Sequence, residues 1–279
     1  MVGLMQQNSP ELPAAPDPAS MRAVERITLI LRSFSMAKPM LTLTEVARET
    51  GLDKNTTRRL LMALVTSGLV RRNEADGTWG LDIGVLKLQP AVLGPRTLRE
   101  TASPFLQGLT EQTRMTSFFW IADPEGAICI ERVRASGVFL DVPWSTTGTV
   151  VPLNMAAGPR VILAHVSNQE RATWLSRPQL RHTRLTETDP ADLLRAVARI
   201  RLQGYELVAD DFCVGMAGLG VPVLDRSGKF VGAISVTSST GAFQGPGREE
   251  MILSAARATA AAIGIRLGFQ PGKPAGEAG

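Results

Sequence analysis

Apolar residues recur at spacings of three and four between Ser20 and Lys38, which predicts a first amphipathic helix. Ser20 is a suitable N-cap for this helix, and the Lys38-Pro39 pair ends its pattern. The predicted buried face comprises Val24, Ile27, Leu31 and Phe34.

A second, shorter helix is predicted after Thr42, because Thr42 and Glu45 have the spacing of a capping box. Val46 and Ala47 would bury this helix, and Gly51 can close it in the left-handed conformation. Asp53 can then cap a third helix that runs to Gly68, with Leu60, Leu61 and Leu64 on its inner face. Three helices with such a tight turn predict a helix-turn-helix.

Two short apolar segments at residues 69–72 and 78–81 flank an Asp76-Gly77 pair. Asp-Gly between two such segments is a strong hairpin signal, because glycine adopts the positive φ that the turn needs. A helix-turn-helix followed by a two-stranded hairpin is a winged helix, which is the fold predicted for this part of the chain.

The remaining pattern alternates between strands and helices and predicts an α+β fold with an antiparallel sheet packed on helices. A short helix is expected before Pro90, and Gly94-Pro95 marks a link to the next element. Predicted helices cover residues 96–114 (restarted by Pro104), 154–165, 169–176, 190–203 and 248–267, and predicted strands cover 118–121, 127–130, 219–224 and 230–236.

Composition fits a folded protein: 44% of the 279 residues are hydrophobic and 20% are charged. No secretion signal or apolar segment of membrane-spanning length is visible, and the two cysteines cannot form a disulfide framework. We therefore expect a cytoplasmic protein without membrane contact. Residues 1–20 and the last residues, rich in Pro, Gly and Ala, are expected to be flexible tails.

The formal net charge of +4 is too small to indicate a nucleic-acid partner by itself. Its distribution is more informative, because residues 21–81 carry ten bases against six acids. The basic density therefore coincides with the predicted helix-turn-helix.

The third helix presents side chains that suit DNA. Asparagine can bond bidentately to adenine and arginine to guanine, while lysine suits a phosphate. Arginines on the wing could follow the backbone or enter the minor groove. A solvated amphipathic face would explain these residues separately, but their order and spacing together favour DNA binding. The candidate DNA-binding residues are Thr44, Lys54, Asn55, Thr56, Arg58, Arg59, Arg71 and Arg72.

Several motifs of the chain resemble the IclR-type transcriptional regulators. In the N-terminal part the resemblance is carried by residues 23–27, 43–47, 53–61, 68–70 and 79–84. In the C-terminal part it is carried by residues 151–158, 199–211, 215, 221–223 and 233–236. The chain departs from the family's pattern at Asn154, where His is usual, at Pro159-Arg160, where Gly-Lys is common, and at Ala217-Gly218, where Arg-Cys is common.

The resemblance implies a sequence-specific regulator, repressor or activator, whose affinity for a partly palindromic operator is modulated by a small metabolite. It also implies a homodimer or a dimer of dimers. The expected domains are a tail (1–20), a winged helix (21–82), a linker helix region (83–100), a GAF/PAS-like effector domain (101–268) and a second tail (269–279).

By the same resemblance, the effector pocket would lie at the start of the helix near residue 157, where a helix N-terminus can receive an anion. Its ligand would be an organic acid or an aromatic compound. The candidate residues are Met155, Ala156, Ala157, Gly158, Asp210, Asp211, Cys213, Ser235 and Thr237. The alternative is that the two hydroxyls lie on a solvated strand face and the acidic pair caps a turn. Whether Trp120 and Trp144 line the pocket or pack beneath it stays open.

The alternative functions are an enzyme and a ligand-independent DNA-binding protein. Catalysis is disfavoured because His165 and His182 lack acidic or nucleophilic neighbours in sequence, and no phosphate loop, zinc motif or nucleophile elbow occurs. No catalytic residue, metal site or cofactor is therefore expected. Cys213 could be a redox sensor, but its acidic neighbours disfavour the thiolate, and Cys129 is expected in the core.

Overall fold

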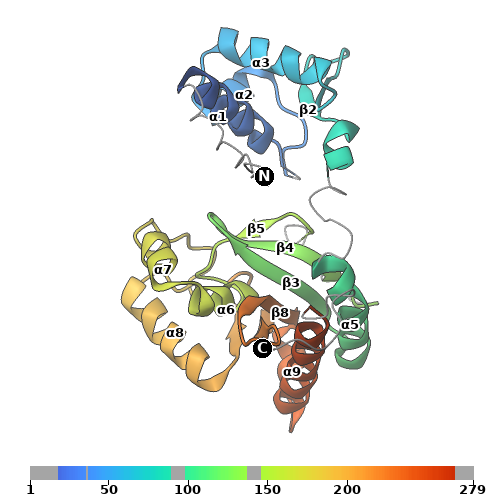
Figure 1. Cartoon of the computed structure of the whole chain (residues 1–279), viewed down its shortest axis with the longest axis vertical. Helices are drawn as coiled ribbons and strands as arrows, with labels where there is room; N and C mark the ends of the chain where they lie inside the picture. The colour runs from blue at the N-terminus through green and yellow to red at the C-terminus, as the bar shows by residue number, and fades with distance from the viewer. Residues whose placement is uncertain (1–17, 36, 89–97, 137–145, 268–279) are drawn as a thin grey trace, which may run out of the picture. The chain divides into compact units, whose positions relative to one another are not determined.

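The computed structural model describes residues 18–35, 37–88, 98–136 and 146–267, which form two compact units divided between Val92 and Leu93 (Figure 1). The expected tail up to residue 17, the link at 89–97, Trp144 and the expected C-terminal tail lie outside the described residues.

The N-terminal unit is a winged helix-turn-helix. Its elements are α1 (Pro18–Ser33), α2 (Leu43–Thr50), α3 (Lys54–Thr66), β1 (Val70–Arg72), β2 (Trp79–Leu81) and the 3-10 helix η1 (Ile83–Leu88). The antiparallel pair β1–β2 places Arg71 opposite Gly80, and Gly77 adopts a φ of 70° in the turn between them. Ile30, Leu61, Leu64 and Trp79 are central to the core of this unit. The hairpin signal and the helix order are thus confirmed.

The first helix differs from its prediction at two places. It already includes Pro18, so Ser20 lies inside the helix and is no N-cap. Val24 is 63% exposed, and Ile30 instead is fully buried beside Phe34, so the prediction for Val24 is wrong. Ile27, Ile30 and Phe34 have the same three-and-four spacing as the predicted set, but the buried face of the helix is rotated slightly from the predicted face.

The described residues of the C-terminal unit form one antiparallel sheet of six strands in the order β5-β4-β3-β8-β7-β6. These strands are β3 (Thr116–Asp123), β4 (Gly126–Val133), β5 (Val150–Val151), β6 (Glu206–Ala209), β7 (Met216–Leu224) and β8 (Phe230–Ser239). The helices are α5 (Leu98–Thr113), α6 (Ala157–His165), α7 (Asn168–Leu175), α8 (Pro190–Gln203) and α9 (Arg248–Leu267), with the 3-10 helix η2 (Thr240–Phe243) before α9.

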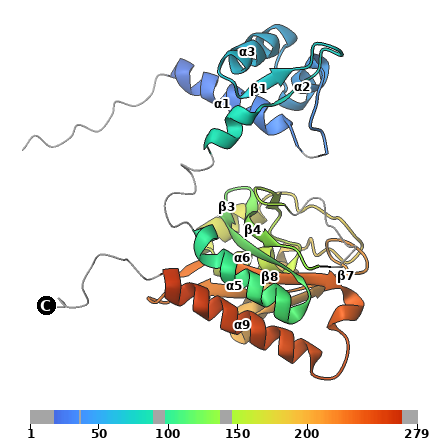
Figure 2. The ribbon, with the colours of Figure 1, turned by 90° about the vertical axis from the view of Figure 1, so that its right-hand side faces the viewer.

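Helices cover both faces of this sheet, α5 and α9 on one face and α6 with α7 and α8 on the other (Figures 1 and 2). Alternation along β3 sorts the side chains between the two layers: Phe119 packs with α5 and α9, whereas Phe118 and Trp120 face the α6 layer. The expected α+β class with a winged helix-turn-helix and an antiparallel sheet is confirmed.

Some boundaries differ from the sequence predictions. The short strands β5 and β6 were not predicted, and α6 begins at Ala157 rather than at Asn154. Helix α5 is continuous from Leu98 to Thr113 with Pro104 inside it, so Pro104 does not restart the helix. None of the helices in the described residues is long and apolar enough to span a bilayer.

Candidate DNA-reading helix and effector pocket

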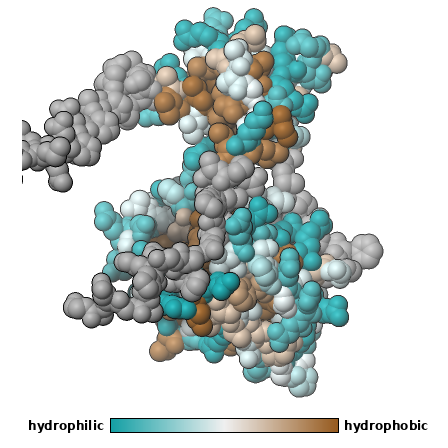
Figure 3. Space-filling view, turned by 45° about the vertical axis from the view of Figure 1, so that its right-hand side comes forward, coloured by the Kyte–Doolittle hydropathy of each residue, from teal (hydrophilic) through white to brown (hydrophobic). Residues whose placement is uncertain are grey.

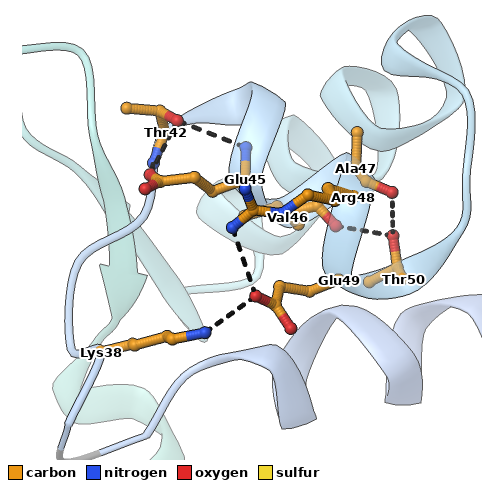
Figure 4. Close-up of polar contacts among 8 residues, drawn as sticks. All are labelled: Lys38, Thr42, Glu45, Val46, Ala47, Arg48, Glu49 and Thr50. Carbon is orange, nitrogen blue, oxygen red and sulfur yellow. Dashed lines mark hydrogen bonds and ion pairs between the residues drawn. The ribbon is translucent and has the colours of Figure 1, made fainter.

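The start of α2 is fixed by the predicted capping box (Figure 4). The backbone N–H of Thr42 donates to Glu45 Oε2 at 2.8 Å, and the N–H of Glu45 donates to Thr42 Oγ1 at 3.3 Å. The hydrogen bonds from Thr42 lower the pKa of Glu45, so this cap is strongest with an ionised carboxylate. Lys38 Nζ also bonds Glu49 at 2.8 Å, which ties the preceding loop to α2.

The turn into α3 sets which residues of that helix face outward. Gly51 ends α2 with a φ of 69°, and Asp53 caps α3 by accepting from the Thr56 N–H at 2.9 Å. Thr57 is fully buried, and its hydroxyl donates to the Asp53 carbonyl at 2.8 Å. Because Thr57, Leu61 and Leu64 face the core, the opposite face of α3 is left to solvent.

Most of the candidate DNA-binding residues are exposed, and only Thr56 is half-buried. In the described part of the chain, the side chains of Lys54, Asn55, Arg58 and Arg59 have no hydrogen-bond or ion-pair partner. Three positive charges and one amide therefore project from the N-terminal half of α3 without compensation. This is the arrangement that base edges and phosphates require of a recognition helix.

The two wing arginines are not equivalent. The guanidinium of Arg72 lies 5.5 Å from the centroid of the Trp79 ring and 3.7 Å from Glu74. Both contacts hold it against the wing. Arg71 is exposed on the same strand, and its side chain has no such contact within the described residues. Of the two wing arginines, Arg71 is therefore the one whose guanidinium is available to bind DNA.

A cavity opens in the C-terminal unit between the sheet and the start of α6. Its volume is about 50 Å³. Its walls are predominantly apolar, which is typical of small-molecule sites. The lining residues are Phe118, Trp120, Val151, Ala156, Ala157, Val208, Asp211, Phe212, Cys213, Met216, Ala217, Gly218, Ser235 and Thr237.

Six of the nine candidate effector residues line this cavity, namely Ala156, Ala157, Asp211, Cys213, Ser235 and Thr237. Met155 lies in the core instead, Gly158 packs beneath Trp120, and the Asp210 carboxylate accepts from the Gly215 N–H in a turn. Trp120 lines the cavity and donates from Nε1 to Ser235 Oγ at 2.9 Å.

Sequence reasoning missed much of the apolar lining. Phe118 could have been found, because it stands two positions before Trp120 on a predicted strand and shares its face. Val208 and Met216 lie on β6 and at the start of β7, where no strand was predicted, so no periodic signal pointed to them. Ala217 and Gly218 were named only as departures from the family's pattern, and Val151 only as the start of the motif at residues 151–158. Phe212 had no signal of its own.

The start of α6 combines a strained backbone with a buried carboxylate. Ala156, the N-cap residue, has a φ of 59°, and its N–H donates to Asp211 Oδ2 at 2.8 Å. Burial raises the pKa of the Asp211 carboxyl, while this hydrogen bond and the charge of the buried Arg160 oppose the rise.

Two glycines allow α6 to lie directly on the sheet. A Cβ atom at Gly220 would stand 2.8 Å from the Ala157 carbonyl carbon, and one at Gly158 would stand 2.4 Å from the Trp120 ring. Either contact is shorter than packed atoms tolerate. The backbone of α6, which forms one wall of the cavity, therefore packs directly against the backbone of β7.

Both histidines lie against aromatic rings, and one of the two cysteines is buried in the core. His165 stacks on Phe230 with 4.8 Å between ring centroids, and burial lowers its pKa. His182 lies 4.9 Å from the Phe212 ring. Cys129 is fully buried in the core, as expected, and burial raises its pKa to about 12. Among the residues that the structure describes, no three His, Cys, Asp or Glu side chains are grouped as metal ligands.

A winged helix with an unpaired basic reading face, joined in one chain to a domain with a small-molecule cavity, defines a ligand-responsive DNA-binding regulator. Comparison with known families agrees: residues 23–74 match the IclR helix-turn-helix domain, and residues 91–265 match the family described as the bacterial transcriptional regulator IclR C-terminal. The chain belongs to the IclR family, whose members pair a DNA-binding domain with an effector-binding domain.

Curated relatives include the Pca operon regulatory protein of Acinetobacter baylyi, which is 28% identical over 222 residues and covers 76% of each chain. The regulator XynR of Escherichia coli is 27% identical, covering 78% of this chain and 86% of its own. Both relatives are regulatory proteins.

Solved structures share the fold. An IclR-type regulator from Silicibacter superposes with a TM-score of 0.78 at 22% identity, covering 89% of this chain and 97% of that one. An IclR homologue from Microbacterium hydrocarbonoxydans, solved in complex with 4-hydroxybenzoate, has a TM-score of 0.72 at 21% identity and covers 88% and 98% of the two chains.

Proposed function

We propose that α3 reads operator bases and that the cavity at the start of α6 binds the effector that changes operator affinity. The unpartnered basic face of α3 carries this proposal. Asn55 and Arg58 would contact base edges, and Lys54 a phosphate. Thr56 could contact a thymine and Arg59 a guanine, and Arg71 and Arg72 would follow the DNA backbone or enter the minor groove. Thr44 completes the set of candidate contacts. The reader would comprise residues 21–82 and the sensor residues 101–268, joined by residues 83–100.

The chain would act as a homodimer, or as a dimer of dimers, on a partly palindromic site. Apolar surface of the N-terminal unit supports this, and it is visible as brown patches in Figure 3. The large apolar side chains that this unit exposes are Val24, Leu29, Met62, Leu81, Ile83, Leu86 and Leu88. Apolar side chains that gather on a surface are typical of interaction sites.

Selection of duplexes from a random DNA library by the full chain tests this function. The expected result is a partly palindromic motif whose half-sites are separated by whole helical turns, bound with strong salt dependence. Recovery of unrelated sequences would contradict sequence-specific reading. If sedimentation analysis shows that a monomer binds the palindromic motif, the proposed dimeric state is contradicted but sequence-specific DNA binding is not.

Effector control is tested on the selected duplex. Small metabolites that raise the melting temperature of the full chain should also change its affinity for the operator. A metabolite that binds in the cavity and leaves operator affinity unchanged would contradict effector control. Chemical conversion of that metabolite by the protein would indicate an enzyme instead.

A further inference from the structure

The cavity at the start of α6 is small for a metabolite. Its volume is about 50 Å³. By comparison, an apolar cavity that accepts benzene measures about 150 Å³. An effector that binds here must therefore move at least one wall outward. The walls differ in how firmly they are held, and this difference identifies the wall that can move.

The helix wall and the sheet wall are firmly held. Helix α6 packs on the backbone of β7, where a Cβ atom at Gly220 would lie 2.8 Å from the Ala157 carbonyl carbon. In the sheet, β8 is paired with β3 on one side and β7 on the other, and Val151 of β5 is paired opposite Ala127. Outward movement of either wall would break main-chain packing or ladder hydrogen bonds, which costs more free energy than the opening of a loop.

The third wall is a loop that follows β6, which we call the cavity loop (residues 210–213). Asp211, Phe212 and Cys213 of this loop line the cavity. Strand β6 is at the edge of the sheet, so the loop continues from a strand that is paired on one side only. Val214, the next residue, is 76% exposed. The cavity loop therefore lacks the support on both sides that the other walls have.

Two threonines from a distant part of the chain hold the cavity loop by its main chain. Both belong to the α7–α8 segment (residues 180–187), which lies between those two helices in the chain (Figure 1). Thr183 Oγ1 donates to the Asp210 carbonyl at 2.6 Å, and Thr186 Oγ1 donates to the Asp211 carbonyl. Each hydroxyl also accepts N–H groups of its own segment, which fixes its direction.

The α7–α8 segment is itself anchored to the start of α6 by Asn154. This side chain is fully buried, and its Nδ2 donates to the Leu180 carbonyl at 2.8 Å and to the Glu187 carbonyl at 2.7 Å. One amide group thus holds both ends of the segment. The Asp211 carboxylate accepts the Ala156 N–H and joins the cavity loop back to α6. The start of α6, the α7–α8 segment and the cavity loop therefore form a closed ring of hydrogen bonds.

From these contacts we infer that the cavity loop is the wall that opens to admit an effector, and that Asn154, Thr183 and Thr186 are positioning residues that set how readily it opens. None of the three is among the described residues that line the cavity. The inference rests on the proposed role of the cavity as the effector site, and it names the wall that an effector displaces. Side-chain hydrogen bonds hold this wall to the α7–α8 segment, and removing one donor should loosen it.

Hydrogen exchange of the full chain, measured by mass spectrometry on peptides, tests the inference without any ligand. The reporters are the amides of Asp210 and Met216, whose N–H groups bond within the turn that contains the cavity loop. Thr183→Val and Thr186→Val each remove a hydroxyl donor at nearly constant volume. Each variant should speed exchange of these amides at least fivefold and leave the exchange of α6 and β8 unchanged, because only the loop loses a contact.

Two matched variants serve as controls. Thr186→Ser keeps the hydroxyl and should retain the wild-type exchange of the cavity loop. Thr173→Val changes an exposed threonine of α7 and should have no effect. Unchanged exchange of the cavity loop in both Thr183→Val and Thr186→Val would overturn the inference. Equal acceleration in α6 and β8 would overturn it too, because the threonines would then support the stability of the whole unit and not one wall.

Asn154→Ala tests the anchor of the ring. It should speed exchange in the α7–α8 segment and in the cavity loop together, since the segment that holds the loop is released. Faster exchange in the segment with an unchanged cavity loop would contradict the role of Asn154 as a positioning residue.

Effector binding distinguishes failure of this inference from failure of the proposed function. A metabolite that raises the melting temperature of the full chain should associate at least fivefold faster with Thr186→Val than with the wild-type chain, and it should slow exchange in the cavity loop. A metabolite that binds and slows exchange only in α6 or the sheet would contradict the moving wall and leave the effector role standing. If no metabolite binds, the effector role is contradicted, whereas the exchange result for the threonine variants still decides how the loop is held.

Discussion

The Asp211 carboxylate accepts the backbone N–H of Ala156 at 2.8 Å and so joins the loop after β6 to the start of α6, 55 residues earlier in the chain. Ala156 has a φ of 59°, a conformation that costs an L-residue free energy. Asp211→Ala would remove the acceptor and leave this N–H unpaired. We expect a loss of about 1–3 kcal/mol in the free energy of unfolding of the C-terminal unit, measured by urea denaturation. Asp211→Asn is the control and should lose much less.

The same carboxylate predicts a pH dependence. Burial raises its pKa in the folded state above the ordinary value of 3.8, so at intermediate pH the folded state binds more protons than the unfolded state. The contribution of Asp211 to stability therefore decreases as the pH rises from 3.8 through the raised pKa, and stays low above it. Melting temperatures of the wild-type chain and of Asp211→Asn should diverge over this interval in favour of the variant. A difference independent of pH would contradict the assignment.

Substitutions on α3 should separate base reading from phosphate contact. Asn55→Ala or Arg58→Ala should cost about 1–3 kcal/mol on the selected operator and relax the preference at one base position. Lys54→Ala should weaken binding to all duplexes alike and reduce the salt slope. Arg184→Ala, an exposed arginine of the C-terminal unit, is the control for lost charge. Fluorescence anisotropy on operator and scrambled duplexes measures each effect, and unchanged specificity in both Asn55 and Arg58 variants would refute the reading helix.

The capping box of α2 predicts a stability effect without a change in specificity. Thr42→Ala removes the acceptor of the Glu45 N–H and should destabilise the N-terminal unit by about 1 kcal/mol. Operator affinity should fall equally for all sequences, because the reading residues remain. Thr28→Ala is the matched control, since that exposed hydroxyl bonds only to the carbonyl one helical turn earlier. A Thr42→Ala variant with altered base preference would contradict this separation.

Glycine-to-alanine substitutions should have opposite effects on stability at a tightly packed position and at an open helical position. Gly158→Ala places a methyl group 2.4 Å from the Trp120 ring and should cost about 1–3 kcal/mol through overpacking. Gly108→Ala, within helix α5, meets no atom within 4 Å and should stabilise the chain by up to about 1 kcal/mol. Thermal unfolding of both variants checks the sign of each effect. Similar shifts in the two would show that the α6–sheet contact is not tight.

The winged helix could be predicted almost completely, because its signals are local. The capping pair Thr42 and Glu45, the left-handed Gly51 and the Asp76-Gly77 turn each act within a few residues. The C-terminal unit depends on distant pairing instead. Strand β6 contains Glu206, a charge that sequence patterning does not place in a core, and it is buried because Arg199 of α8 bonds both of its carboxylate oxygens.

The cavity was predictable only in part, for the same reason. Ser235 and Thr237 lie on the same face of a strand because side chains alternate along it. Once the strand is predicted correctly, both residues are therefore expected at the same site. The start of α6 offered no such rule, because Met155 and Ala156 are adjacent and only the conformation of Ala156 decides which of them faces the cavity. That conformation depends on Asp211, which no local pattern connects to it.

The close approach of α6 to β7 at Gly220 has a consequence for how ligand preference can evolve. One wall of the cavity is positioned by main-chain atoms, which point mutations do not displace without disrupting the packing. New side chains at Ala157 or Gly218 can fill the space, but none can widen it between these two elements. Variation at lining residues outside these two elements, at Val151 and Val208, is therefore the accessible route to a larger cavity.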